Sequence, residues 1–412
     1  MELVQALFGG LFAFTPQMLV MYAIGALLIW LAVKKDYEPM LLLPIGFGAI
    51  LVNLPFATAW LSDGMGAGTG GAEPGDAAAV AGEAAGEVAG ILKILYDSGI
   101  ATELFPCLIF IAVGAMIDFS ELIKNPRMLL FGAAAQFGIF FTVLAALWLG
   151  NALDAAFGMN MGIDLKTAAS IGIIGAADGP TSIVVASKFA RQHLGPITVA
   201  AYSYMALVPI IQPPVIRLLT TRKERLIRMS YQDRSVSKAA LIAFPVIVTL
   251  VSGILAPFSA PLVGLLMFGN LIRVCGVLER LSQAAQNELA NIVTLLLGIT
   301  IGATMRASEF LRPITLLILA LGLVAFVFDT AGGVLFAKLL NVFSKNKINP
   351  MVGAAGISAF PMSARIVQKM AAKEDPTNFI LMQSTGANVA GQLGSVVAGG
   401  LILSLVPWLL SL

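Results

Sequence analysis

The sequence predicts an all-α polytopic membrane protein with two inverted-topology repeats, each containing a re-entrant hairpin of broken helix. Three observations lead to this fold class. The 412 residues are 58% hydrophobic and only 12% charged, with a mean hydropathy of +0.91. Two apolar segments are interrupted by glycines and a proline, and the chain matches itself at one fixed offset. Because this little polar surface cannot cover a water-soluble globule of this size, we place the chain in a bilayer.

Apolar runs approach or reach the length of about 20 residues that a helix needs to cross a bilayer. The predicted spans are 17–33, 38–55, 100–117, 127–149, 194–216, 239–256, 258–274, 286–304, 313–337 and one or two over 376–411. Residues 1–16 lack the basic flank and small-residue cleavage site of a secretory signal. We interpret them as an amphipathic segment that leads into the first span.

The positive-inside rule places the loops. The Gly/Ala-rich linker 57–91 has acidic residues but no Lys or Arg, so it is predicted to be flexible and outside. The basic loop 219–238 is predicted to be cytoplasmic. That loop falls inside only if segment 166–190 enters from the outer face and returns as a hairpin. The same distribution of Lys and Arg in the loops makes 347–372 a second hairpin, which enters from the cytoplasm.

An internal repeat supports this topology. A shift of 181 positions pairs Gly172 with Gly353, Gly175 with Gly356, Pro180 with Pro361, Ser182 with Ser363 and Lys188 with Lys369. The predicted organisation is a first membrane repeat over 17–218, the basic loop, and a second repeat over 239–412. Because equivalent spans of the two repeats run in opposite directions in this topology, the pattern is that of alternating-access transporters.

Several function classes are excluded. The net charge is only +2, and the basic residues lie in loops without interleaved aromatic residues, so no nucleic-acid partner is expected. Cys107 and Cys275 lie in separate apolar segments, far from any cluster that would hold a transition metal, and are interpreted as packing residues. His193 is the only histidine and is predicted to be a solvated loop residue. No Ser-His-Asp arrangement or phosphate loop is visible.

Asp178 is the main candidate for ion binding. It lies in the motif GIIGAADGPTS, where Gly179 permits unusual backbone angles and Pro180 cannot donate a hydrogen bond. Irregular backbone at membrane depth is tolerated only where it is buried in protein or lines a wet cavity. A small cation could bind the Asp178 carboxylate and freed carbonyl groups. The alternative is a capping role at the start of the helix that follows.

The second interrupted segment has no acid but offers neutral oxygens from Asn349, Ser358 and Ser363. Hard cations such as Na+ accept ligands of this kind. The alternative is close packing of small residues between helices. Asn388, in the Gly-rich stretch STGANVAGQLGS, is either another oxygen ligand or an interhelical hydrogen-bonding amide.

Three further polar residues lie inside apolar segments. The charge of Arg365 is costly within a membrane segment. Its side chain would bind a substrate carboxylate, pair with Asp178 or extend to the cytoplasmic face. Tyr204 is interpreted from the sequence alone as a packing residue, with a proton-donor role as the lesser alternative. Asp329 is a candidate proton or ion group whose role the sequence does not settle.

Four segments resemble the signature stretches of one family: GIIGAADGPTSIVVASK, AAYSYMALVPIIQPP, KNKINPMVGAAGISAFPMSAR and GANVAGQLGS. The family is the beta subunit of the sodium-pumping, biotin-dependent decarboxylases, which act on oxaloacetate, methylmalonyl-CoA, glutaconyl-CoA or malonate. The resemblance covers nearly the whole chain, and only the acidic Gly/Ala linker departs from it. It implies a carboxybiotin decarboxylase of the bacterial inner membrane that exports Na+ while a proton is consumed.

The resemblance also implies roles for individual residues. The sodium-site aspartate falls on Asp178, the functional tyrosine on Tyr204 and the arginine on Arg365. Further metal ligands fall on Asn349, Gly353, Ser358 and Asn388. In the implied mechanism, Arg365 fixes the carboxylate of carboxybiotin, Na+ displaces a proton at Asp178, and Tyr204 relays that proton to the biotin nitrogen.

The implied cofactors are Na+ and a biotin carried by a partner, because this chain has no biotin-accepting Met-Lys-Met motif. The implied partners are a carboxyltransferase alpha subunit, a biotin carrier subunit and a small gamma or delta membrane subunit, in an oligomeric complex surrounded by membrane lipid. A stand-alone sodium-coupled carboxylate transporter or Na+/H+ antiporter would share the repeats and Asp178. A non-catalytic anchor is the weakest alternative, since it has no need of polar residues at paired breaks.

Overall fold

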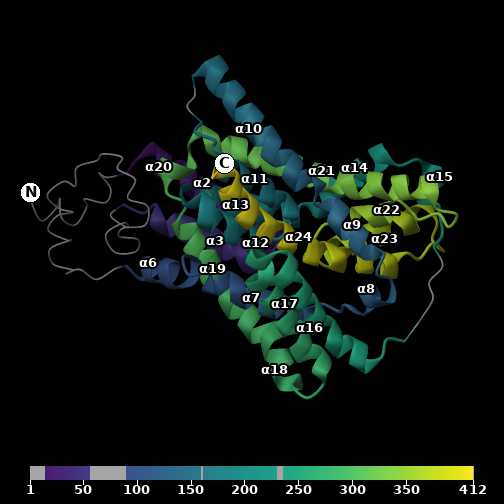
Figure 1. The fold of residues 1–412 in the computed structure, drawn as a ribbon. Coiled ribbons are helices and arrows are strands. Elements are labelled where there is room, and N and C mark those ends of the chain that lie inside the picture. Colours follow the sequence, from purple (N-terminus) through teal and green to yellow (C-terminus); the bar gives the residue numbers. More distant parts are fainter. Residues whose placement is uncertain (1–13, 56–89, 159–160, 230–234, 412) are drawn as a thin grey trace, which may run out of the picture.

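The computed structural model of the protein describes residues 14–55, 90–158, 161–229 and 235–411. These residues form helices and connecting loops without a strand (Figure 1). The first half contains α2 (Pro16–Lys35), α3 (Pro39–Val52), α6 (Ile91–Leu95), η1 (Tyr96–Ile100), α7 (Leu104–Met116), α8 (Ser120–Lys124), α9 (Met128–Ala135), α10 (Phe137–Phe157), α11 (Leu165–Gly172), η2 (Ile173–Ala176), α12 (Gly179–Phe189), η3 (Arg191–His193), α13 (Leu194–Ala206), α14 (Val208–Leu219) and α15 (Arg222–Arg225).

The second half contains α16 (Lys238–Leu255), η4 (Pro257–Ser259), α17 (Ala260–Cys275), α18 (Glu279–Ala284), η5 (Ala285–Leu289), α19 (Ala290–Ala303), α20 (Ala307–Phe310), α21 (Pro313–Phe343), α22 (Met351–Ala354), α23 (Met362–Glu374) and α24 (Leu381–Leu410). Within the described residues, seven helical segments are long and apolar enough to cross a membrane, and two bent pairs raise this number to nine. The prediction of an all-α polytopic membrane protein is confirmed.

Two predicted spans differ from straight helices. The predicted span 100–117 is the second arm of a pair, Ile91–Ile100 and Leu104–Met116, bent by 59°. The predicted span 194–216 divides at Leu207 into arms bent by 69°. Pro209 lies in the first turn after that break, where a missing N–H costs no helical hydrogen bond. The predicted segment 1–16 and linker 57–91 lie almost wholly outside the described residues.

Equivalent helices of the two predicted repeats pack reciprocally. The second helix of the first half, α3, packs on α19, and the second helix of the second half, α17, packs on α7. A π-helical turn precedes both α7 and α19. Both contacts use glycine at the crossing, since a Cβ on Gly48 would lie 2.5 Å from the Ile299 carbonyl oxygen and one on Gly114 would lie 1.8 Å from that of Leu266. This exchange of partners is the arrangement that a duplicated unit would produce.

The two interrupted segments lie inside the bundle. The first consists of α11, η2 and α12, and the second of α22 and α23. Both pack against α21 or α24, the two long helices that run through the molecule (Figure 1). Residues 167–187 of the first segment are buried without exception, although the segment contains Thr167, Ser170, Asp178, Thr181 and Ser182. A buried segment with this many polar groups is a candidate functional site.

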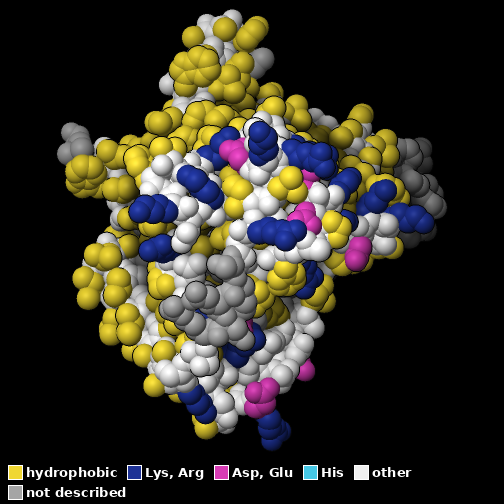
Figure 2. Space-filling view, turned by 90° about the vertical axis from the view of Figure 1, so that its right-hand side faces the viewer, with side chains coloured by type: hydrophobic (Ala, Val, Ile, Leu, Met, Phe, Trp, Pro, Cys, Tyr) yellow, Lys and Arg dark blue, Asp and Glu magenta, His cyan; other side chains and the backbone are white. Residues whose placement is uncertain are grey.

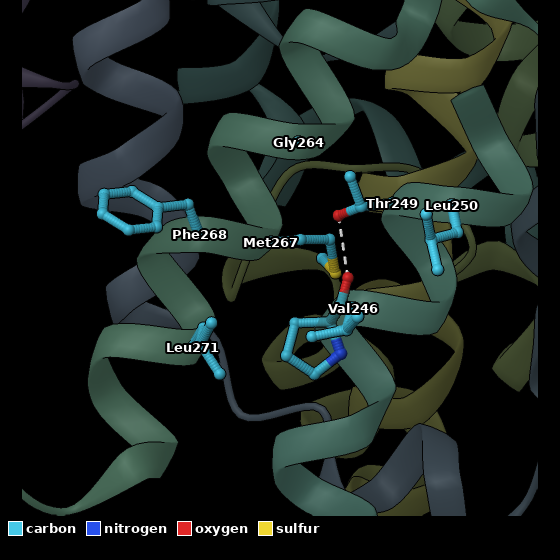
Figure 3. A pocket seen from close by; sticks show the side chains of 8 residues that line it. Val246, Thr249, Leu250, Gly264, Met267, Phe268 and Leu271 are labelled. Carbon is cyan, nitrogen blue, oxygen red and sulfur yellow. Dashed lines mark hydrogen bonds between the residues drawn. The ribbon is translucent and has the colours of Figure 1, made fainter.

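The outer surface is apolar, as lipid contact requires. Leu144, Trp148 and Ile254 are 68%, 74% and 77% exposed. A shallow apolar groove of about 280 Å³ lies between α16 and α17 (Figure 3). Its one hydroxyl, on Thr249, donates to the Pro245 carbonyl group at 2.8 Å. Because the lining offers no polar group that lacks a partner, this groove is a lipid-facing surface rather than a chemical site.

The glycine contact between α7 and α17 yields a stability prediction. Gly114→Ala places a Cβ against backbone, so the helices must separate, and we expect a loss of about 1–3 kcal/mol. The measurement is the thermal unfolding midpoint of the purified protein in detergent. The control is Gly253→Ala on α16, whose new Cβ would have its nearest neighbour at 3.7 Å. Equal midpoints for the two variants would show that the crossing tolerates a side chain.

Candidate functional site

The first helix break sets the position of Asp178. After η2 the chain turns through Ala177, which has a left-handed φ of 51°, and Asp178 is extended. A new helix, α12, begins at Gly179 with Pro180 in its first turn. Asp178 therefore holds the N-cap position of α12, but its carboxylate makes no capping hydrogen bond to a backbone N–H group. Asp178 thus has the position of a helix-capping residue without the capping hydrogen bond.

The Asp178 carboxylate is 4% exposed and accepts three hydrogen bonds on Oδ2. The donors are Thr181 Oγ1 at 2.5 Å, Ser395 Oγ at 3.0 Å and Gln392 Nε2 at 3.3 Å. All three donors are neutral, and no ion pair among the described residues includes Asp178. A carboxylate at this depth is costly without a compensating positive charge. A bound cation or a proton would supply that charge.

The second break contacts the first. The Ser358 hydroxyl, between α22 and α23, donates to the carbonyl oxygen of Ala176, two residues before Asp178. The Asn388 amide donates to the Ile357 carbonyl group at 2.6 Å, and its own buried Oδ1 has no hydrogen-bond partner in the described part of the chain. Asp178, Ser358 and Asn388 thus belong to one polar cluster of neutral oxygens and a single acid. Oxygen-rich clusters of this kind suit a hard monovalent cation.

Helix α24 joins the two breaks through one face. Asn388 and Gly391 contact the second break, and Gln392 and Ser395 contact Asp178 at the first. These positions follow the spacing of successive turns on one side of a helix. Sequence reasoning selected Asn388 from this stretch and missed Gln392 and Ser395. The signal was present, because both polar residues recur on the Asn388 face of an otherwise apolar helix.

The two neighbouring tyrosines have different surroundings. The Tyr204 hydroxyl donates to the Leu319 carbonyl oxygen on α21. The hydroxyl of Tyr202 lies over Gly179, where a Cβ would be 2.3 Å from that oxygen. The phenol of Tyr202 is therefore next to the residue that follows Asp178, whereas no hydrogen bond links Tyr204 to Asp178.

Two predicted ligands lie elsewhere. The Asn349 amide donates to the carbonyl groups of Arg225 and Ile227, both at 2.9 Å, and its oxygen accepts from Met351 N at 3.1 Å. The hydrogen bonds of this side chain thus go to the basic loop and to its own segment, and none goes to Asp178, Ser358 or Asn388. Gly353 lies against α21, where a Cβ would be 2.0 Å from the Gly333 carbonyl oxygen. Helix packing therefore explains why this position needs glycine. Close packing of small residues between helices was the alternative to ion binding in the sequence analysis.

Ser363 does not join the Asp178 cluster either. It hydrogen-bonds the Gln212 side chain, whose Nε2 lies 2.7 Å from Ser363 Oγ. The same Nε2 donates to the Ala354 carbonyl group at 2.8 Å. Gln212 on α14 thus connects both arms of the second interrupted segment.

Arg365 is exposed on α23 and forms no ion pair with Asp178. Figure 2, which faces the end that carries α15 and α23, shows Lys and Arg side chains gathered there. The acidic end of this helix orders the basic loop, since Arg225 binds Glu374 at 2.8 Å and Arg228 binds Asp375 at 2.7 Å. Hydrogen bonds from Thr377 and Arg228 lower the pKa of the Asp375 carboxyl to about 2, so it remains charged.

A small polar hollow lies beside these ion pairs. It measures about 320 Å³ and is lined by Arg217, Met370, Lys373 and Glu374. Two of the four lining residues are basic and one is acidic. Arg365 and Lys369 are exposed on the same helix. This end of the molecule therefore offers cationic groups to an anionic partner.

Fold and site together define a polytopic helical membrane protein in which two broken segments meet at a buried acid, a construction typical of proteins that move small ions. The family described as Na+-transporting oxaloacetate decarboxylase beta subunit matches residues 17–406. The chain belongs to this family, and the resemblance of its four motifs is confirmed.

Curated relatives cover almost the full length. The oxaloacetate decarboxylase beta chain of Klebsiella pneumoniae is 48% identical over 94% of both chains. The methylmalonyl-CoA decarboxylase subunit beta of Propionigenium modestum is 48% identical over 96% of both chains. The glutaconyl-CoA decarboxylase subunit beta of Acidaminococcus fermentans is 46% identical, over 96% of this chain and 95% of its own length. This chain is a multi-pass protein of the bacterial inner membrane and one subunit of a multi-subunit decarboxylase.

The contacts of Asn349 yield a prediction about the basic loop. Asn349→Asp retains the oxygen that accepts from Met351 N but loses both donors to Arg225 and Ile227. We expect trypsin to cleave after Arg225 and Arg228 several-fold faster in the variant, because local opening exposes the loop. The control is Asn346→Asp, in the exposed turn before the second segment. Identical cleavage rates in Asn349→Asp and wild type would contradict the loop-anchoring role.

Proposed function

We propose that this subunit decarboxylates carboxybiotin presented by a partner subunit and couples that reaction to Na+ export with uptake of a proton. The observation that carries the proposal is the buried Asp178 carboxylate, which has only neutral hydrogen-bond donors and lies where two helix breaks meet. Family membership supports the decarboxylase chemistry, and the relatives named above supply its three substrate classes. Na+ is the transported substrate in this proposal.

The proposed Na+ site consists of Asp178 with oxygens of the second break and α24. Ser358 and Asn388 are retained from the sequence prediction, because both contact the breaks directly. The unpartnered Asn388 Oδ1 is an available neutral ligand. We propose indirect roles for Asn349 and Gly353, since their contacts hold the second segment to the basic loop and to α21.

The proposed docking surface is the basic end that carries α15 and α23. A biotin carrier subunit would bring carboxybiotin there, together with a carboxyltransferase alpha subunit and a small gamma or delta membrane subunit. The donor groups fit an N-carboxylate, because the Arg365 guanidinium is exposed and has the fork geometry that binds a carboxylate through two hydrogen bonds. When bound, carboxybiotin supplies a carbon–nitrogen bond whose cleavage releases CO2 and leaves a nitrogen that takes up a proton.

The chain's own residues would carry the coupling. In this proposal Na+ arrival at Asp178 displaces its proton, and Tyr204 relays that proton toward the cytoplasmic side. The Tyr204 hydroxyl now donates to the Leu319 carbonyl group, so a relay requires this bond to exchange. Helix α23 begins at the second break and ends at the basic loop, and so connects the docking surface to the ion cluster. Differential affinity for carboxylated and free biotin would bias the breaks between two arrangements.

The alternative is a stand-alone sodium-coupled carboxylate transporter or a Na+/H+ antiporter. Such proteins share paired broken helices around an intramembrane acid. Genes for a biotin carrier and a carboxyltransferase beside the gene for this chain would favour the pump. Their absence would favour the transporter.

The first test is Asp178→Asn in the purified complex, measured as decarboxylation of carrier-bound carboxybiotin with and without Na+. We expect wild type to require Na+ and the variant to lose at least about a hundredfold in rate, because a coupling charge at membrane depth is removed. The control is Asp118→Asn, an exposed acid on a loop. Full activity without Na+, or an unaffected Asp178→Asn variant, would exclude this pump mechanism.

The second test is Arg365→Lys with the same assay. The ammonium group keeps the charge but cannot form the two-pronged hydrogen bonds, so we expect a tenfold or larger loss of kcat/KM for carboxybiotin, about 1.4 kcal/mol, with folding unchanged. The control is Arg280→Lys, an exposed residue on α18. Wild-type turnover in Arg365→Lys would remove Arg365 from carboxylate binding.

A further inference from the structure

A second acid, Asp329 on α21, is buried in the membrane region but plays no part in the mechanism above. It is 1% exposed. Its Oδ1 accepts a hydrogen bond from Ile139 N at 3.2 Å, in the first turn of α10. Its Oδ2 has no hydrogen-bond partner among the described residues. A buried carboxylate oxygen without a partner is rare and calls for a ligand.

The unpartnered oxygen faces the first interrupted segment. A Cβ on Gly175 would lie 2.3 Å from Asp329 Oδ2, and one on Gly138 would lie 2.6 Å from Oδ1. Glycine at both positions lets two backbones approach the carboxylate closely. Gly175 belongs to η2, the short 3-10 segment that leads to Asp178. Asp329 therefore packs on the same segment that Asp178 follows.

The contacts of Asp329 stabilise only one end of its carboxylate. The backbone N–H group of Ile139, just after the one-residue interruption between α9 and α10, donates to Oδ1 and stabilises this end of the carboxylate. No hydrogen bond of the described residues reaches Oδ2. No ion pair among them includes Asp329. Among the described residues, the negative charge therefore has only backbone N–H groups to stabilise it.

Other unpartnered oxygens lie on α10 and at its start. Gln136 Oε1, at the N-cap of α10, and Thr142 Oγ1, one turn beyond Gly138, are both buried without a hydrogen-bond partner in the described part of the chain. Thr142 follows Gly138 by four residues and so shares its face toward α21. Neutral oxygens are ligand types that a hard cation accepts together with a carboxylate.

We propose that Asp329 forms a second binding site for a small monovalent cation, distinct from the Asp178 cluster and separated from it by η2. The ligand class is a desolvated alkali cation held by Asp329 Oδ2. The choice of Na+ as that cation rests on the proposed function. Two sites separated by η2 give an ion two positions within the membrane. Occupation of either site changes the electrostatic field at η2.

The test counts Na+ bound at equilibrium by the purified complex without carboxybiotin, using radioactive sodium with choline as the replacement cation. Asp329→Asn retains an oxygen for Ile139 N, so the contact with α10 survives while the charge is lost. We expect this variant to bind one Na+ fewer per chain than wild type. Asp178→Asn should also lose one Na+, and the double variant should lose both.

Each outcome has a defined meaning. If Asp329→Asn binds as many Na+ as wild type while Asp178→Asn binds fewer, Asp329 only caps α10 or holds a proton, and the second site is wrong. If Asp178→Asn binds as many as wild type, the proposed function fails instead. If Asp329→Asn does not fold, Gly175→Ala carries the test, because its methyl group occupies the space at Oδ2 and leaves the charge. We then expect a roughly tenfold or larger loss of affinity at one site, with Gly253→Ala as the control, and unchanged affinity would overturn the proposal.

Discussion

Broken backbone inside a membrane must find hydrogen-bond partners within the protein, and the rest of this structure depends on that constraint. The two breaks satisfy it together. Ser358 of the second break binds the Ala176 carbonyl group of the first, and Asn388 on α24 binds the Ile357 carbonyl group of the second. Because each break completes the other, neither can move without altering the oxygens around Asp178. If Asp178 binds Na+ as proposed, ion binding and the arrangement of the breaks are therefore coupled.

The same constraint extends to the basic end of the molecule. Asn349 anchors the loop backbone at Arg225 and Ile227, and Gln212 holds both arms of the second segment. Helix α23, the second arm of that segment, ends at Glu374, which binds Arg225. A partner that docks on this end thus contacts groups that are connected to the membrane centre by one helix and a few hydrogen bonds. Allosteric coupling needs such a physically connected element with two arrangements.

Much of this architecture could be predicted from the sequence. Hydropathy located the spans, and Gly-Pro interruptions located both breaks, because these signals are local. The bends within 100–117 and at Leu207 were missed, since apolar runs continue through them. The acid at the centre was predicted as Asp178, but Gln392, Ser395 and Tyr202 were not, because their contact with the first break depends on how α24 and α13 pack. The family motif assigned Asn349 to the ion, whereas its amide donates to the carbonyl groups of Arg225 and Ile227, which lie 124 and 122 residues earlier in the chain.

The proposed function requires that the two breaks and α24 form one cation site at Asp178. The most direct measurement is a structure of the complex in which Na+ is replaced by Tl+, located by its anomalous scattering. We predict a Tl+ peak in contact with the Asp178 carboxylate, on the side of the second break and Asn388, that weakens when Na+ is added back. A map with no peak at Asp178, or with peaks that Na+ does not displace, would contradict this account.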